Sequence, residues 1–367
     1  MKKLRKNLIK PFITLVAILS IAINFNVFAS AETVYTNTKD TRIATIPTKN
    51  DRGNIGGISI GKKKNSMFVV KSGNDNNANL YYYPNINNAS NYAIFSLLGA
   101  GHANSMAIDN NNVYVSAWNN NSSDYAYVIR ISRSTIANMP FNQNASTISY
   151  TKLPTIYKTY NNSTGSYSYS VANNISAITK YENTDKFIVH STLPDDTGTN
   201  DYFIFSFASI ENYNGKESFV IERSENSTFL VKNTLKNNST SQDIYYSATN
   251  GGLFIPRWDG AKACKNVIAW AHLNSSYSMI NINGFNLKCY VPDKISVDRT
   301  NQKGYGVNMY SKFEIESLAF TENNDMLFTC NIENTNSYLS AYKKDKNKKP
   351  PADGVFKLTK SDGGKFI

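Results

Sequence analysis

The stretch SMAIDNNNVYVSAW, residues 105–118, decides the fold, because it joins a short apolar strand, an Asn-rich turn and a second apolar strand. Four further stretches repeat the pattern: GGISIGKKKNSMFVVKSG (56–73), SAITKYENTDKFIVHST (176–192), YYSATNGGLFIPRW (245–258) and SLAFTENNDMLFTCN (317–331). The repeats begin near Gly57, Ser105, Ser176, Tyr245 and Ser317, so their spacings are 48, 71, 69 and 72 residues. Spaced all-β units predict a closed ring of blades, here a five-bladed β-propeller.

The two ends of the chain are predicted to meet in the last blade. The segment TVYTNTKDTRIATI, residues 33–46, alternates polar and apolar side chains as a half-buried strand does. Its expected partner is GVFKLTK, residues 354–360, because a ring closed by the N-terminal strand leaves no exposed sheet edge. No low-complexity linker divides the chain, so we expect residues 32–367 to form a single β-propeller domain.

The amino terminus has the features of an export signal. Five basic residues precede an apolar run over residues 11–28, which ends at the small-residue site Ala29-Ser30-Ala31. Asn24 and Asn26 interrupt the run, which favours a cleaved signal peptide, residues 1–31, over a membrane anchor. The sequence therefore predicts a secreted, monomeric protein with no membrane span. Its net charge falls from +12 to +7 when the signal is removed, a modest excess that attracts anionic surfaces. Nucleic acid is not an expected partner of an exported chain.

Two repeats align without a gap, which indicates internal duplication. The alignment places His102 opposite Gln242, Ala103 opposite Asp243 and Trp118 opposite Trp258. It also matches the Asn-rich turn of the second repeat with an Asn-Gly-Gly turn in the fourth, a composition typical of hairpins with positive backbone φ.

The order of the repeats resembles a known family. GAGHANSMAIDNNNVYVSAW, YAYVIRISRSTI, NNISAITKYENTDKFIVHST, EIESLAFTENNDMLFTCN and DGVFKLT together are similar to the helveticin J type of large heat-labile bacteriocins, over residues 50–360. The resemblance lies in the blade pattern and includes no long identical stretch. It implies a five-bladed propeller with antimicrobial activity against bacterial envelopes.

A polar funnel is expected where the inner strands begin, because these positions crowd around the central channel of a propeller. The predicted ligand-binding residues are His102, Asn104, Asn174, Asp243 and Glu316. Amide and imidazole groups offer paired donors and acceptors that suit sugar hydroxyls, so the expected partner is a bacterial cell-wall or surface glycan. The alternative is that these side chains bond to one another and to channel waters.

Two further functions stay open from the sequence. An extracellular glycoside hydrolase needs two carboxylates about 5–9.5 Å apart, and Asp243 with Glu316 or Glu314 are the candidates. Strand alternation would place Glu314 and Glu316 on the same side. The third class is a non-catalytic adhesin or scaffold.

Other chemistry has little support. No Gly-x-Ser-x-Gly elbow is present, the three histidines are scattered, and no metal or cofactor is expected. Cys264, Cys289 and Cys330 allow one disulfide, with Cys264 and Cys289 as the favoured pair, or three buried thiols. Among the tyrosines, Tyr81 to Tyr83, Tyr167 and Tyr169 are candidates for stacking on sugar rings.

Overall fold

The structure is a computed structural model, and it describes the chain from the first predicted strand onward, with gaps. The described residues are 33–47, 54–61, 65–73, 76–117, 126–181, 184–190, 202–224, 227–232, 243–259, 265–273, 281–282, 287–290, 313–332 and 353–366. Within these ranges, no helix has both the length and the apolar character needed to cross a membrane. The predicted signal peptide, residues 1–31, lies outside them.

The first repeat forms an antiparallel sheet with one added parallel strand. Its order from the centre outward is β3 (Asn54–Gly61), β4 (Ser66–Ser72), β5 (Ala78–Tyr83), β6 (Ala93–Leu97) and β10 (Ser146–Thr147). A 3-10 helix, η1 (Ile86–Asn88), lies between β5 and β6, with the Asn85 side chain accepting a hydrogen bond from the Asn87 backbone N–H.

The second and third repeats share one larger sheet. The second comprises β7 (Met106–Ile108), β8 (Asn112–Ala117), β9 (Tyr127–Ser132), β11 (Thr151–Asn161) and β12 (Ser166–Val171). The third comprises β13 (Ala177–Lys180), β14 (Phe187–His190), β15 (Tyr202–Tyr213), β16 (Lys216–Arg223), β17 (Thr228–Lys232) and β21 (Asn281–Ile282). The two join at their outer strands, where β11 pairs in parallel with β16. The short helix α2 (Arg133–Asn138) follows β9 directly.

The last two repeats form separate sheets. One has the order β18 (Tyr245–Ser247), β19 (Gly252–Asp259), β20 (Lys265–His272), β22 (Leu287–Tyr290) and β1 (Thr33–Tyr35). The other has the order β23 (Phe313–Phe320), β24 (Met326–Ile332), β25 (Gly354–Lys360) and β2 (Thr38–Thr45). The expected pairing of the chain's two ends is confirmed, since β2 runs antiparallel to β25 with Thr38 opposite Lys360.

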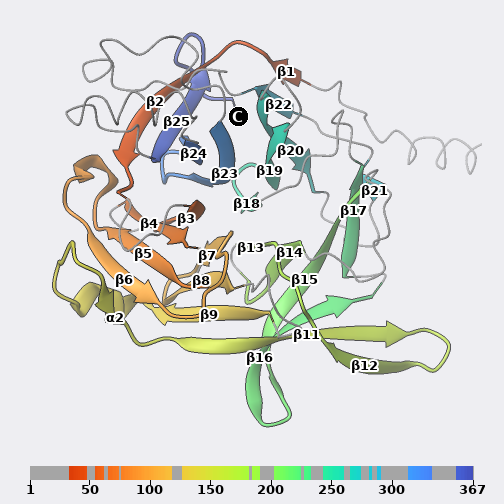
Figure 1. The fold of residues 1–367 in the computed structure, drawn as a ribbon. Coiled ribbons are helices and arrows are strands. Elements are labelled where there is room, and N and C mark those ends of the chain that lie inside the picture. The colour runs from red at the N-terminus through yellow and green to blue at the C-terminus, as the bar shows by residue number, and fades with distance from the viewer. Residues whose placement is uncertain are drawn as a thin grey trace, which may run out of the picture. The chain divides into compact units, whose positions relative to one another are not determined.

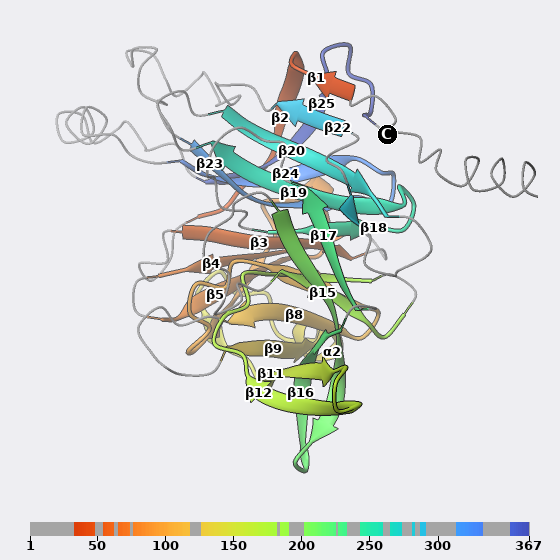
Figure 2. The same cartoon turned by 90° about the vertical axis from the view of Figure 1, so that its right-hand side faces the viewer.

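The innermost strand of each repeat contacts the innermost strand of the next. Contacts link β3 to β7, β7 to β13, β13 to β18, β18 to β23 and β23 to β3, and we call these the inner strands. Figure 1 shows the sheets following one another around a common centre, and Figure 2 shows the strands of each sheet lying side by side. The arrangement is all-β and propeller-like.

Apolar side chains between neighbouring sheets form the core. Five clusters of buried residues are present in the described part of the chain, each between two successive repeats. Met106 packs toward the first repeat, for example, whereas Ala107 next to it packs toward the third. Strand alternation produces this division, and burying one large apolar side chain contributes about 2 kcal/mol.

Three details differ from the sequence predictions. The pairing of β23 with β24 shifts register between Ile315 and Ser317, so the regular alternation expected for Glu314 and Glu316 is broken at Glu316. Cys289 and Cys330 are buried free thiols, so Cys289 is not in the disulfide favoured from the sequence, while Cys264 lies outside the described residues. Burial raises the pKa of both described thiols, which keeps them protonated and unreactive.

The gapless alignment of the second and fourth repeats is also corrected. Ala107 pairs with Tyr114 in the second repeat, but Tyr245 pairs with Phe254 in the fourth. When Phe254 is superimposed on Tyr114, the inner strand of the fourth repeat is shifted by two residues from the register of the gapless sequence alignment. Asp243 is then level with Ser105 and not with Ala103.

Candidate functional site

A large cavity opens at the ends of the inner strands, on the side of their first turns. Its volume is about 750 Å³, within the range of ligand pockets. All five inner strands contribute to its wall, with residues such as Ile60, Ile108, Lys180, Tyr246 and Phe320. We call it the turn-side cavity.

Asp109 makes one wall of the turn-side cavity rigid. Its Oδ1 accepts hydrogen bonds from the backbone N–H groups of Asn111 at 2.8 Å and Asn112 at 2.7 Å. The hydroxyl of Tyr114 donates to its Oδ2 at 2.8 Å, and burial together with this bond raises the pKa of Tyr114. The Arg133 guanidinium donates to the Asp109 carbonyl oxygen at 3.0 Å. The turn after β7 is therefore stabilised by its own backbone N–H groups, by Tyr114 and by Arg133.

The adjoining wall, formed by β13, β18 and β23, combines aromatic rings with polar groups. The Lys180 ammonium lies 4.1 Å from the centre of the Phe187 ring, and burial lowers the pKa of Lys180. The hydroxyl of Thr179 accepts a hydrogen bond from the backbone N–H of Tyr246 at 3.0 Å, which links β13 to β18. The Tyr245 and Phe320 rings lie 5.3 Å apart between β18 and β23.

The rim of the cavity is polar and nearly neutral. Asn250 and Asn324 exchange amide hydrogen bonds of 3.1 and 3.2 Å between the turns after β18 and β23. The charged residues of the lining are Arg133 and Lys180 against Asp109, Asp185 and Glu322. Across the described residues, no group of three or more His, Cys, Asp or Glu side chains is arranged to hold a metal ion.

Asp243 fills the centre on the other side of the inner strands. Its carboxyl group contacts the Ser105 hydroxyl and also hydrogen-bonds to the backbone N–H groups of Ile244 and Leu318. Ser105 in turn bonds to the backbone of Ile178, with both distances 2.9 Å. The two buried side chains, Asp243 and Ser105, thus connect four repeats. We call Asp243, Ser105 and their backbone partners the hub.

Asp243 is buried in the hub, which changes the acidity of its carboxyl group. The residue is only 1% exposed, and this burial raises its pKa well above the usual value, against the opposing effect of the hydrogen bonds from Ser105 and the backbone. The carboxyl group therefore holds its proton more strongly than an exposed aspartate does. A buried, hydrogen-bonded carboxyl group at this position fits a structural role within the hub.

The other predicted site residues lie near the hub, at the starts of the inner strands. Glu316 is buried at the register shift of β23 and accepts a hydrogen bond from the Asn331 amide at 2.8 Å. Asn331 also accepts from the Ile55 backbone N–H at 2.9 Å, which ties Glu316 to β3. His102, Asn104 and Asn174 are half-buried, and burial lowers the pKa of His102, so its imidazole is neutral at physiological pH.

None of these five residues lines the turn-side cavity. Contacts through Ser105 and Gly56 bring their segments together on the opposite side. Gly56 and Gly57 allow this close approach, because a Cβ on Gly56 would lie 2.3 Å from the Ala103 carbonyl oxygen. The described cavity therefore lies at the turns and includes none of the five predicted site residues.

Many cavity residues belong to the turns that come after the inner strands. These residues are Asp109 to Asn111, Thr184 with Asp185, and Thr321, Glu322 and Asn324. The inner strands all enter from the hub side and end at the cavity, so either set of ends can hold a funnel. At the hub end Asp243 makes a buried contact with Ser105, and a single sequence does not show which side chains make such a contact.

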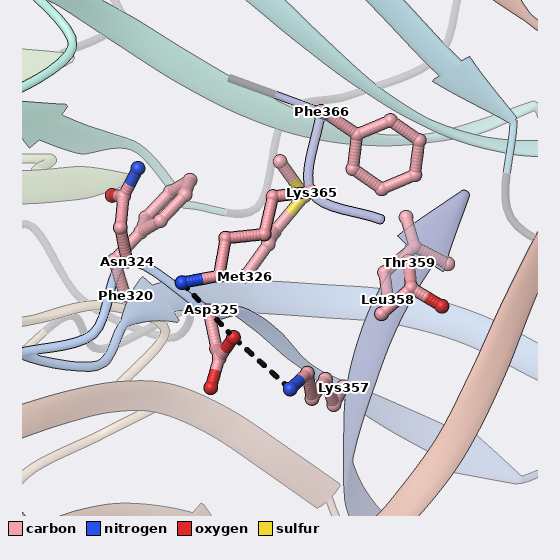
Figure 3. Close-up of a pocket in the computed structure, with 9 residues that line it drawn as sticks. All are labelled: Phe320, Asn324, Asp325, Met326, Lys357, Leu358, Thr359, Lys365 and Phe366. Carbon is pink, nitrogen blue, oxygen red and sulfur yellow. Dashed lines mark ion pairs between the residues drawn. The ribbon is translucent and has the colours of Figure 1, made fainter. Parts of the chain in front are cut away.

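A second, much smaller pocket lies beneath the C-terminal segment (Figure 3). Asp325 forms ion pairs with Lys357 at 3.0 Å and Lys365 at 3.6 Å, which fasten residues 361–366 to the turn between β23 and β24. The enclosed volume is about 10 Å³, enough for one water molecule and not for a ligand.

Comparison with known proteins reveals only remote likeness. No protein-family model matches the chain, and no curated protein matches it. Among solved structures, the tail fibre of Staphylococcus aureus phage P68 aligns with a TM-score of 0.44 and 10% identity over 88% of this chain. The chain covers 52% of that tail fibre, about half its length. An α-L-arabinofuranosidase from Lactobacillus brevis aligns with a TM-score of 0.43 and 12% identity, over 84% of this chain and 91% of that chain.

Proposed function

We propose that the chain is an exported five-bladed β-propeller, closed by β2, that binds a glycan of the bacterial envelope in the turn-side cavity. The ring is supported by the unbroken succession of inner-strand contacts, in which β23 meets β3. The pairing of β2 with β25 supports closure by the N-terminal strand. A bacteriocin-like action on envelopes follows from the family resemblance and is part of the same proposal.

The cavity carries the proposal through its size and its lining. About 750 Å³ accommodates a short oligosaccharide, and the half-buried Tyr245 supplies aromatic surface of the kind that packs against sugar rings. Exposed amide and hydroxyl groups, including those of Asn110 and Thr249, match sugar hydroxyls as donors and acceptors.

The charges favour an uncharged or mixed-charge sugar. Two basic and three acidic side chains line the cavity, so it presents no strong positive field to an anionic polymer. A neutral or amino-sugar segment of a wall polysaccharide fits this balance better than a uniformly phosphorylated chain.

The hydrolase alternative has weaker support. Asp243 is held in the hub, and Glu316 is bonded to Asn331, so both carboxyl groups are buried and neither faces the turn-side cavity. The Glu316→Gln variant tests this directly. Loss of sugar release from wall polysaccharide in that variant would favour the hydrolase.

The binding experiment uses the exported chain and a panel of purified wall polysaccharides. Asn110→Trp and Thr249→Trp place bulk at the exposed rim of the cavity and are expected to weaken binding at least about 10-fold. Asn87→Trp, an exposed position on η1, is the matched control and should bind normally.

Variants on the hub side decide between the two ends. His102→Ala and Asn174→Ala should leave binding unchanged if the turn-side cavity is the site. If they abolish binding while the rim variants retain it, the ligand sits where the inner strands begin. Growth inhibition of related bacteria, measured with the same set of variants, tests whether binding is coupled to killing.

A further inference from the structure

The β11–β12 hairpin presents an open sheet edge. β12 pairs with β11, and the described part of the chain contains no strand on its other side. All six residues of β12 are exposed. Figure 1 and Figure 2 both show this hairpin at the periphery, far from the inner strands. A row of backbone N–H and C=O groups along β12 is therefore available for pairing.

This edge lacks the usual protection against another strand. Proteins normally guard exposed edges with charged residues, proline or bulges. β12 has the sequence SYSYSV, with no charge and no proline, and its pairing with β11 runs without a bulge from Ser166 to Val171. Its alternation of Ser with Tyr and Val favours extended backbone.

One face of the hairpin is rich in exposed aromatic surface. Tyr167, Tyr169 and Val171 lie on the same face and are 46%, 42% and 38% exposed. Tyr160 is directly opposite Tyr167, with ring centres 5.0 Å apart, and the Tyr169 ring stacks on Tyr213 at 4.9 Å. Grouped exposed tyrosines are typical of protein interfaces.

We propose that β12 pairs antiparallel with β12 of a second copy of this chain, forming a two-fold symmetric dimer. In antiparallel strands, directly opposite residues share a face. A two-fold axis perpendicular to the sheet places each residue on the same face in both copies. The numbers of two residues that lie directly opposite each other therefore add to an even total. Tyrosine faces of the two copies therefore always join, and serine faces do likewise.

Among the registers that obey this rule, the one centred on Ser168 gives the most favourable side-chain pairs. It places Tyr167 of one copy opposite Tyr169 of the other, twice, and pairs Ser166 with Ser170. Aromatic residues opposite one another stabilise antiparallel sheets. The absence of charge on β12 means that no like charges meet across the axis. The nearby Lys158 is already paired with Glu211 at 3.4 Å.

A dimer of this form would carry two turn-side cavities. Joined sites bind a repeating polymer more tightly than separate ones, because the second binding event becomes intramolecular. This consequence rests on the proposed glycan binding, whereas the dimer itself does not.

Sedimentation of the exported chain over a range of concentrations tests the pairing. The expected result is a mass that rises from one to two copies, and Tyr167→Pro and Tyr169→Lys should each reduce it to one copy. Ala172 donates its backbone N–H to Thr155 on β11, so the N–H groups of the odd-numbered residues of β12 face the open edge. Pro at Tyr167 removes one of these donors, and Lys places like charges near one another across the axis. Ser163→Lys, in the turn of the same hairpin, is the matched control and should remain dimeric.

Cysteine cross-linking tests the register. In a Cys264→Ser background, Ser168→Cys should cross-link to itself under mild oxidation, whereas Ser166→Cys should not, because its partner position is Ser170. A monomer at all concentrations overturns the proposal, as does a dimer that both edge variants leave intact. Polysaccharide binding that requires Tyr167 and Tyr169 in a strictly monomeric protein would instead assign this face to a glycan.

Discussion

Replacing Asp243 with Asn is expected to change how stability depends on pH. The folded protein raises the pKa of this carboxyl group by burial, well above its ordinary 3.8. The contribution of protonated Asp243 to the free energy of unfolding is therefore fully present below the unfolded-state pKa. It is lost as the pH rises toward the folded-state pKa. An Asn amide can keep hydrogen bonds to Ser105 and to the backbone N–H of Leu318, but it does not titrate.

The magnitude follows from proton linkage. Above pH 4 the unfolded chain releases a proton that the folded chain retains, which costs wild type about 1.4 kcal/mol for each pH unit until Asp243 itself ionises. The stability of Asp243→Asn relative to wild type should rise by that amount per unit over this window. Urea denaturation at several pH values measures the difference, with Asp362→Asn, an exposed carboxylate, as the control.

A pH-independent difference between wild type and Asp243→Asn would refute the reasoning. It would mean that Asp243 titrates alike in both states, which requires water in the hub. A difference that instead fell with increasing pH would show that the carboxylate is stabilised in its charged form.

Two further predictions concern the packing around the hub. Gly57→Ala would place a Cβ 2.6 Å from the Met106 backbone nitrogen, so we expect a loss of about 3 kcal/mol or more in the free energy of unfolding and a lower Tm in calorimetry. Burial lowers the pKa of His190 to about 4, so its contribution is complete above pH 6.5 and is lost as pH falls toward 4. That loss is about 3 kcal/mol, and His190→Gln should remove this part of the acid sensitivity in urea titrations, or the assignment is wrong.

Much of the fold was predictable from periodic strand patterns and turns. The five repeats, the pairing of residues 33–46 with 354–360 and the all-β class all follow from local signals in the sequence. The joining of β11 to β16 did not, because a parallel contact between outer strands of two repeats leaves no local signature. The shift at Glu316 was also hidden, since a bulge looks like regular alternation in sequence.

The candidate site was predicted less well for a physical reason. Polarity at the strand starts predicted a funnel formed by His102, Asn104, Asn174, Asp243 and Glu316, and none of these residues lines the described cavity. The sequence did not show that the side chain of Asp243 crosses the centre to reach Ser105, two repeats away in chain order. That contact is buried in the hub, and the described turn-side cavity lies at the other ends of the inner strands.

Closure of the ring can be tested through a buried ion pair. The ammonium of Lys71, on β4, lies 2.6 Å from Asp353, just before β25, and Lys71 is 0% exposed. Asp353 also accepts the Ile46 backbone N–H through its carbonyl oxygen, so this contact joins the first repeat to both strands of the closing pair. Lys71→Met leaves a buried carboxylate without its cation, and we expect a loss of about 3–5 kcal/mol in urea denaturation.

The double variant separates the pair from the closure itself. Lys71→Met combined with Asp353→Leu removes both charges and should recover most of that loss, because apolar side chains of similar volume replace a desolvated ion pair at little net cost. If each single variant changes stability by less than about 1 kcal/mol, the two ends of the chain are not packed together as described. If the two ends of the chain pack together, the double-mutant cycle should give a strong coupling free energy between Lys71 and Asp353. Residues 282 positions apart in the sequence interact only through the folded structure.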